Sequence, residues 1–219
     1  MARKQFDLIV FDWDGTLMDS TAMIVQAIQA AARDLGLPVP TDMAAAHVIG
    51  LGLAEALQMV FPDLDTKWYP RIVERYRHHF LLREHELPLF PGVREMLENL
   101  KQEDYFLAVA TGKSRVGLNR ALESVGLQKL FDVTRCADET FSKPHPAMLW
   151  EITKTLGQDM QRTVMIGDTT HDLQMAENAG AAAIVVEYGA HDSNDLLALN
   201  PLFSAKTVPE LHRWLNQHA

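Results

Sequence analysis

The chain has 219 residues, of which 47% are hydrophobic and 22% are charged. This composition is typical of a soluble globular protein and excludes a disordered, collagen-like or disulfide-rich chain. A chain of this length corresponds to one or two domains. It is expected to bury about 70% of the surface that its unfolded form exposes, so it can build a core without covalent cross-links.

The charge balance is acidic: 20 lysines and arginines stand against 29 aspartates and glutamates, a net charge of −9 with neutral histidines. This balance disfavours binding to nucleic acid or to an anionic membrane, because phosphates are bound by Lys and Arg side chains that displace counterions. If the ligand is anionic, we expect a metal ion to supply part of the positive field.

Cys136 is the only cysteine, so no internal disulfide and no cysteine-based zinc site can form. The first apolar run, Leu8–Phe11, is interrupted by Asp12. It is shorter than the roughly 7–15 residues of a secretory signal and the roughly 20 residues of a membrane span. These features predict a cytoplasmic protein.

Five short apolar runs along the chain have the character of strands that are buried on both faces. They are Leu8–Phe11, Tyr105–Ala110, Phe131–Cys136, Thr163–Ile166 and Ala182–Val186. Apolar residues at helical spacing mark helices near residues 93–100, 118–125 and 149–156, and a closing helix contains Val208, Leu211 and Leu215. Alternating strands and helices predict an α/β core with a doubly wound, Rossmann-like parallel sheet.

The segment between the first two strands breaks this alternation. A helical pattern that Asp19 or Ser20 is placed to cap runs toward Pro38, and further helical patterns cover residues 54–60 and 68–82. The segment is too long to be a loop, so it predicts an inserted all-helical cap subdomain. The predicted boundaries are 1–18 and 88–219 for the core and 19–87 for the cap.

Carboxylates directly follow two of the predicted strands. Asp12 and Asp14 come after the first strand. Asp168 and Asp172 come after the fourth strand, four residues apart where a helix begins, so both can face one side of that helix. Ligands of open α/β sheets bind at the carboxyl ends of strands. The structural alternatives are an Asp-Gly turn at Asp14 and capping of the helix by Asp168.

Two further polar sites follow the second and the third predicted strand. Thr111 and Gly112 open a helix after the second strand, where backbone N–H groups can bind an anion, although a Thr or Ser helix cap is the simpler explanation for this site alone. Lys143 lies between Ser142 and Pro144 in a stiff loop, with a solvated lysine as the alternative. Since all four sites reach the same edge of one sheet, their convergence predicts an active site.

In chain order these sites read Asp12-x-Asp14-Gly15-Thr16, Thr111-Gly112, Lys143-Pro144 and Gly167-Asp168-x-x-x-Asp172. Together they closely resemble the four motifs of the haloacid dehalogenase-like hydrolase superfamily. The helical insertion resembles the small cap of its phosphoglycolate phosphatase and phosphoglucomutase-like branch. The resemblance extends from Leu8 to about Val186 and is far more specific for the superfamily than for a substrate.

The resemblance implies a role for each carboxylate. Asp12 would be the nucleophile that forms an aspartyl-phosphate, and Asp14 would be the general acid and base. A Mg²⁺ ion would be held by Asp12, by the backbone carbonyl of Asp14 and by Asp168, because Mg²⁺ prefers hard oxygen ligands. Asp172 would orient Lys143 or a metal-bound water.

The same resemblance implies that Thr111, Gly112 and Lys143 bind the phosphoryl oxygens. The cap would close over the site, with His47 and the turn Gly50–Gly52 as candidate contacts to the rest of the substrate. His47 can equally be a solvated helix residue.

We therefore expect a Mg²⁺-dependent phosphatase that acts on a small phosphorylated metabolite, with phosphoglycolate as the nearest family substrate. The expected partner is a small-molecule phosphate ester, without nucleic acid or membrane, and the protein is a monomer or a homodimer. A phosphosugar mutase and a 2-haloacid dehalogenase of the same fold are the alternatives. A non-catalytic binding protein is a fourth reading, which the full set of carboxylates and lysine disfavours.

Overall fold

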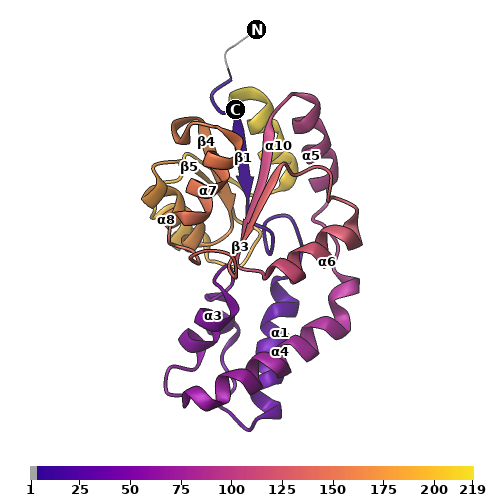
Figure 1. Cartoon of the computed structure of the whole chain (residues 1–219), viewed down its shortest axis with the longest axis vertical. Helices are drawn as coiled ribbons and strands as arrows, with labels where there is room; N and C mark the ends of the chain where they lie inside the picture. Colours follow the sequence, from indigo (N-terminus) through magenta and orange to yellow (C-terminus); the bar gives the residue numbers. More distant parts are fainter. Residues whose placement is uncertain (1–3) are drawn as a thin grey trace.

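The computed structural model describes residues 4–219, which include one parallel six-stranded sheet with the order β3-β2-β1-β4-β5-β6 (Figure 1). The strands are β1 (Leu8–Phe11), β2 (Phe106–Thr111), β3 (Val133–Cys136), β4 (Thr163–Gly167), β5 (Ala182–Val186) and β6 (Phe203–Ala205). The order reverses direction at β1, which pairs with β2 on one side and with β4 on the other. The predicted doubly wound α/β fold is confirmed.

The five predicted strands are present with small shifts in their bounds. β3 begins at Val133 rather than at Phe131, and β2 ends at Thr111, one residue later than the prediction. β6 was not predicted because it has only three residues, with the polar Ser204 in the middle. It pairs with β5 and extends the sheet by one strand.

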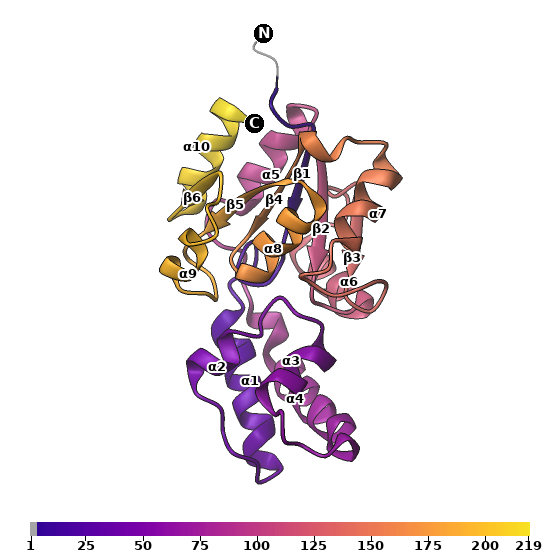
Figure 2. The same ribbon diagram turned by 90° about the vertical axis from the view of Figure 1, so that its left-hand side faces the viewer.

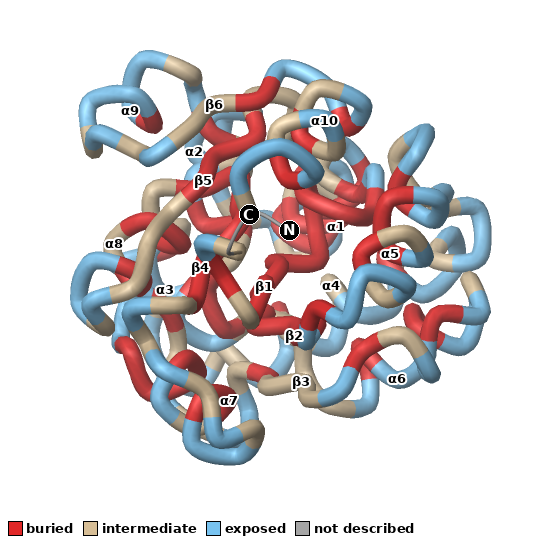
Figure 3. Tube along the Cα trace, turned by 90° about the horizontal axis from the view of Figure 1, so that it is seen from above, coloured by how far each residue is buried: buried red, intermediate tan, exposed pale blue. Residues whose placement is uncertain are grey.

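Helices cover both faces of the sheet. The core helices are α5 (Val93–Gln102), α6 (Arg115–Val125), α7 (Ala147–Leu156), α8 (Thr170–Ala179), α9 (Ser193–Leu197) and α10 (Val208–His218), with a 3₁₀ turn η3 (Met160–Arg162). Ile9 and Phe11 of β1 pack with residues of α5, α6 and α10, whereas Leu8 and Val10 pack with α7 and α8. All four side chains are fully buried because strand side chains alternate between two covered faces (Figure 3).

The segment between β1 and α5 folds as helices only. It contains α1 (Thr21–Asp34), α2 (Asp42–Ala46), α3 (Leu53–Val60) and α4 (Tyr69–Arg83), with short 3₁₀ turns η1 (Thr66–Trp68) and η2 (Glu84–Glu86). Figure 2 shows these helices gathered beyond one end of the sheet. They share their own apolar cluster, which includes Ile28, Leu57 and Phe80. We call this segment the helical insertion (residues 19–87).

The two connections between the helical insertion and the sheet run side by side. The Asp19 N–H donates to the carbonyl of Pro88 at 3.0 Å, and the Phe90 N–H donates to the carbonyl of Leu17 at 3.0 Å. The predicted boundaries at residues 19 and 87 stay a prediction. No helix within residues 4–219 is long and apolar enough to cross a membrane.

Two local predictions in the helical insertion are wrong. α1 ends at Asp34 with Gly36 in the left-handed region at φ +65°, before Pro38 is reached. Ser20 occupies the N-cap position of α1, but its side chain makes no capping hydrogen bond. The Ser20 hydroxyl donates instead to Asp14 Oδ1 at 2.7 Å.

Candidate active site

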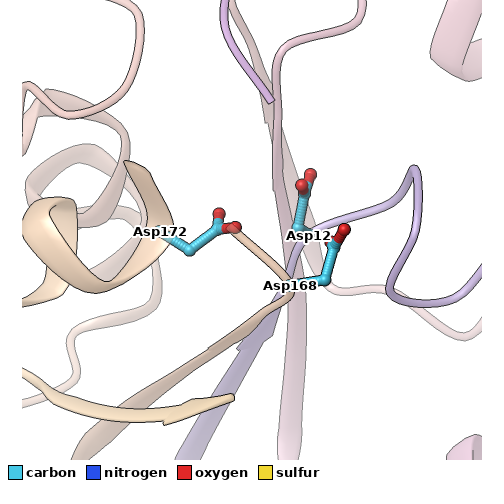
Figure 4. Close-up of side chains that lie close together, drawn as sticks. All are labelled: Asp12, Asp168 and Asp172. Carbon is cyan, nitrogen blue, oxygen red and sulfur yellow. The ribbon is translucent and has the colours of Figure 1, made fainter. Parts of the chain in front are cut away.

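Three carboxylates converge at the carboxyl ends of β1 and β4. Asp12 follows β1, Asp168 follows β4 and Asp172 lies in the first turn of α8. All three are buried, and one oxygen of each lies within 4.8 Å of the others (Figure 4). The parallel pairing of Phe11 with Ile166 places the ends of β1 and β4 at the same edge of the sheet, which brings the first two carboxylates together.

Lys143 reaches this group from the loop that follows β3. Its Nζ atom lies 2.8 Å from Asp12 Oδ1 and 2.6 Å from Asp172 Oδ1, and its side chain is fully buried. The alternative of a solvated lysine is therefore wrong. With all groups ionised, three carboxylates surround one ammonium, so the site has an excess of negative charge.

The pKa values of these groups reflect burial and crowding. Burial raises the pKa of Asp12 well above its usual range, although the nearby Lys143 ammonium opposes the shift. Burial and the neighbouring Asp172 raise the pKa of Asp168 to about 7. Burial lowers the pKa of Lys143, but the attraction of Asp12 and Asp172 outweighs it, so the net shift is upward. A further positive charge would stabilise this group of carboxylates.

The oxygen atoms of Asp12 and Asp168 fit a hard divalent cation. Asp12 Oδ1 accepts the Trp13 N–H at 2.6 Å, while Asp12 Oδ2 is buried with no hydrogen-bond partner among the described residues. Asp168 is held in place by the hydroxyl of Thr16 at 2.6 Å and by the N–H of Ala190 at 2.7 Å. Buried carboxylate oxygens with spare lone pairs are the ligands that Mg²⁺ prefers.

Asp172 is placed differently from the other two carboxylates. Its Oδ2 atom accepts the N–H of Thr169 at 3.1 Å and the Thr169 hydroxyl at 2.7 Å, as part of the capping box that begins α8. Its Oδ1 atom contacts Lys143. Thr169, and not Asp168, is the N-cap residue, so the capping alternative for Asp168 is wrong. The contacts of Asp172 agree with the predicted orientation of Lys143.

Asp14 lies outside the group of three carboxylates and points its side chain toward the helical insertion. Its oxygens accept from the Lys113 ammonium at 2.9 and 3.0 Å and from the Ser20 hydroxyl at 2.7 Å. Lys113 Nζ lies 4.8 Å from the ring centre of Phe80 in α4. Lys113 is therefore paired with Asp14 at the boundary between the core and the helical insertion.

The predicted anion site at Thr111 and Gly112 also lies at this edge of the sheet. Thr111 ends β2 with its side chain buried, and its Oγ1 accepts the Lys113 N–H at 3.2 Å. The N-cap residue of α6 is Ser114, whose hydroxyl oxygen accepts from the Gly117 N–H. Thr111 therefore does not cap this helix.

The turn Gly50–Gly52 of the helical insertion lies directly on the core. A Cβ atom at Gly112 would lie 2.3 Å from the carbonyl oxygen of Leu51, so only glycine permits this approach. A Cβ at Gly50 would lie 3.8 Å from Asp12 Oδ2. The Gly52 N–H donates to the Ser142 hydroxyl at 2.8 Å. The turn therefore covers the site beside the nucleophile candidate.

Three histidines join the helical insertion to the core. The carbonyl of His47 lies 2.9 Å from His171 Nε2 and 3.0 Å from His191 Nε2, and the rings of His47 and His191 stack at 4.9 Å. Burial, together with His171, lowers the pKa of His191 to about 4, so its ring is neutral near pH 7. His47 is exposed, and it contacts the core through its carbonyl and its ring. No sequence pattern indicated His191.

Comparisons with known proteins agree with the motifs. The model of the haloacid dehalogenase-like hydrolase family matches residues 9–186. A probable phosphatase, IndB, of Dickeya dadantii is 40% identical over 211 residues, which cover 93% of this chain and 91% of that protein. A phosphoglycolate phosphatase of Aliivibrio fischeri is 35% identical over 197 residues, which cover 85% of this chain and 86% of that protein.

Among solved structures, one described as a predicted phosphoglycolate phosphatase from Haemophilus somnus 129pt superposes with a TM-score of 0.86 at 25% identity. The superposition covers 97% of this chain and 99% of the chain in that structure. The resemblance read from the sequence motifs is confirmed. Because the family model spans most of the sequence, this chain belongs to the haloacid dehalogenase-like hydrolase family and is an enzyme, a hydrolase.

Proposed function

We propose that this enzyme is a Mg²⁺-dependent phosphatase that hydrolyses a small phosphorylated metabolite through an aspartyl-phosphate intermediate. The observation that carries the proposal is the buried Asp12 Oδ2 atom, which has no hydrogen-bond partner within residues 4–219. On the same carboxylate, Oδ1 is held by Lys143 and by the N–H of Trp13. One oxygen is thus fixed and the other is left for a substrate or a metal.

The metal would be held by Asp12, Asp168 and the backbone carbonyl of Asp14. These ligands suit a divalent cation because the carboxylates are buried close together and their negative charge is not fully compensated. Mg²⁺ bound there would offset the repulsion between the Asp12 carboxylate and a phosphate dianion.

In the first step, Asp12 attacks phosphorus, and the bond between phosphorus and the leaving oxygen breaks. Asp14 gives a proton to that oxygen, so the product leaves as a neutral alcohol. In the second step, Asp14 takes a proton from a water molecule that attacks the aspartyl-phosphate, which releases inorganic phosphate and restores the Asp12 carboxylate. The contacts of Ser20 and Lys113 with Asp14 fix the direction of its side chain.

Lys143, Thr111 and the N–H of Gly112 would bind the phosphoryl oxygens as charge moves onto them in the transition state. Asp172 would act as a positioning residue that holds Lys143. The helical insertion would act as the cap: the turn Gly50–Gly52 lies over the site and would exclude bulk water during the reaction.

The names of the relatives make phosphoglycolate the first ester to test. We further propose that the protein works in the cytoplasm, as a monomer or a homodimer. Its buried, free Cys136 agrees with a reducing compartment.

The decisive experiment is the variant Asp12→Asn, assayed with p-nitrophenyl phosphate and Mg²⁺. The amide lacks the nucleophilic charge, so turnover is expected to fall to background while the circular dichroism spectrum is unchanged. Asp63→Asn, at an exposed position of the helical insertion, is the matched control and keeps full turnover. Unchanged turnover in Asp12→Asn would exclude Asp12 as the nucleophile and contradict the proposed mechanism.

A further inference from the structure

A cavity of about 630 Å³ lies between the helical insertion and the start of α6. Its wall includes Asp14, Gly112 and Lys113 from the core, together with residues of α1, α3 and α4. Pockets of roughly 300–1,000 Å³ typically take ligands of drug-like size. The alcohol of phosphoglycolate, with two carbons and a carboxylate, would leave most of this space unfilled.

The cavity volume does not result from a separation of the helical insertion from the core. The turn Gly50–Gly52 already touches the core, as the 2.3 Å approach that a Cβ at Gly112 would make to Leu51 shows. The cavity therefore persists with the helical insertion seated on the site.

The position of Asp14 assigns this space to the leaving group. In the proposed reaction Asp14 gives its proton to the leaving oxygen, and the side chain of Asp14 forms part of the cavity wall. Asp12, by contrast, is not part of that wall. The alcohol that departs from phosphorus thus extends into the cavity.

Much of the wall is apolar, and its acidic residues outnumber its basic ones. Apolar side chains come from both bodies: Ile24, Ile28, Leu57, Phe80, Leu81 and Val116. The wall also has four acidic and three basic residues. Lys113 is paired with Asp14, and Arg120 is paired with Glu84 at 3.0 Å. Arg77, the third cation, is exposed to water, where pairing with a carboxylate contributes little.

We propose that the cavity binds the leaving group of a phosphate monoester whose alcohol is uncharged, larger than two carbons and largely apolar. This inference rests on the proposed phosphatase function and narrows its substrate class. It places phosphoglycolate among the poor substrates.

The first test compares three primary alkyl esters, ethyl phosphate, phosphoglycolate and 2-phenylethyl phosphate, by phosphate release with Mg²⁺. We expect kcat/KM for 2-phenylethyl phosphate to exceed the other two by about tenfold or more, mainly through a lower KM. Equal values, or a preference for phosphoglycolate, would overturn the inference while leaving the phosphatase function intact. Absence of phosphate release from all three esters and from p-nitrophenyl phosphate would instead overturn the proposed function.

The second test changes the wall. Val116→Trp, at a side chain that is 63% exposed on α6, narrows the cavity without disturbing the core. We expect the ratio of kcat/KM for 2-phenylethyl phosphate over ethyl phosphate to fall about tenfold. Val39→Trp, at an exposed position outside the wall, is the control and leaves the ratio unchanged. An unchanged ratio in Val116→Trp would contradict the assignment.

Discussion

The ammonium of Lys143 lies 2.8 Å from the carboxylate of Asp12, and both side chains are almost completely buried. The two residues lie far apart in the sequence, yet the order β3-β2-β1 brings them to one edge of the sheet. Lys143 also pairs with Asp172, so one cation offsets two buried carboxylates. This arrangement ties the integrity of the site to the stability of the fold.

Replacement of Lys143 by methionine is therefore expected to destabilise the metal-free protein. Removal of one partner of a buried ion pair costs about 3–5 kcal/mol, because the remaining charge stays in the interior without compensation. Urea unfolding in the presence of EDTA measures this loss. Lys154→Met, at an exposed lysine of α7, is the control and should change the free energy of unfolding by less than about 0.5 kcal/mol. A Lys143→Met variant as stable as the wild type would contradict the burial argument.

Asp168→Asn is expected to have the opposite effect on the metal-free protein. The amide removes a buried charge but keeps both contacts, since its oxygen can accept from Ala190 and its NH₂ group can donate to Thr16. The melting temperature without metal should therefore rise, while activity is lost.

The metal prediction is tested on the same variant. A ligand that binds only the folded state raises its stability, so millimolar Mg²⁺ should raise the melting temperature of the wild type. Asp168→Asn should show little or no such shift, and EDTA should lower the melting temperature of the wild type only. An equal shift in both proteins would place the metal elsewhere.

The sequence predicted the residues that gather at the strand ends because their positions follow from topology. In a parallel sheet the carboxyl ends of the strands share one edge, so Asp12 and Asp168 were expected at that edge once their strands were recognised. The pairing of β1 with β4, which the sequence did not predict, brings the two carboxylates together. Lys143 follows β3 by a short loop and reaches the same edge.

Contacts between the core and the helical insertion could not be predicted in this way. The pairing of Lys113 with Asp14 and its approach to Phe80 depend on how the two bodies are oriented, which no local pattern encodes. The same holds for the contact of His191 with His47. The cavity lies between the core and the helical insertion, so its size could not be predicted from the sequence either.

Gly112→Ala tests whether the turn Gly50–Gly52 must lie on the core. The new methyl group would lie 2.3 Å from the Leu51 carbonyl, so the turn must move away from the site. We expect kcat/KM to fall more than about tenfold, with a melting temperature close to that of the wild type because the contact is confined to the surface of the two bodies.

Gly117→Ala is the matched control for this variant. Its Cβ would approach only the Ser114 hydroxyl, at 3.3 Å, and alanine is the better helix former by about 1 kcal/mol. Activity should stay within about twofold of the wild type. Full activity in Gly112→Ala would show that closure of the turn is not needed for turnover.

The pair of Arg115 and Glu139 predicts a pH-dependent contribution to stability next to the loop that joins β2 and α6. Arg115 at the start of α6 contacts both oxygens of Glu139, at 2.9 and 2.6 Å, and its guanidinium holds the pKa of Glu139 below the usual range. Because the folded state binds this proton less readily than the unfolded state, the pair stabilises the fold above the usual pKa of glutamate. The contribution disappears as the pH falls through the lowered pKa.

Both side chains are about one third exposed, so the difference between wild type and Glu139→Gln should be about 1 kcal/mol or less at pH 7. Urea unfolding at pH 7 and in acid measures it. The difference should shrink toward zero in acid, because protonated glutamate and glutamine are then equivalent partners for Arg115. Glu177→Gln, at an exposed position of α8, should show no difference at either pH. A gap between wild type and Glu139→Gln that is as large in acid as at pH 7 would mean that hydrogen-bond geometry, and not charge, joins α6 to the end of β3.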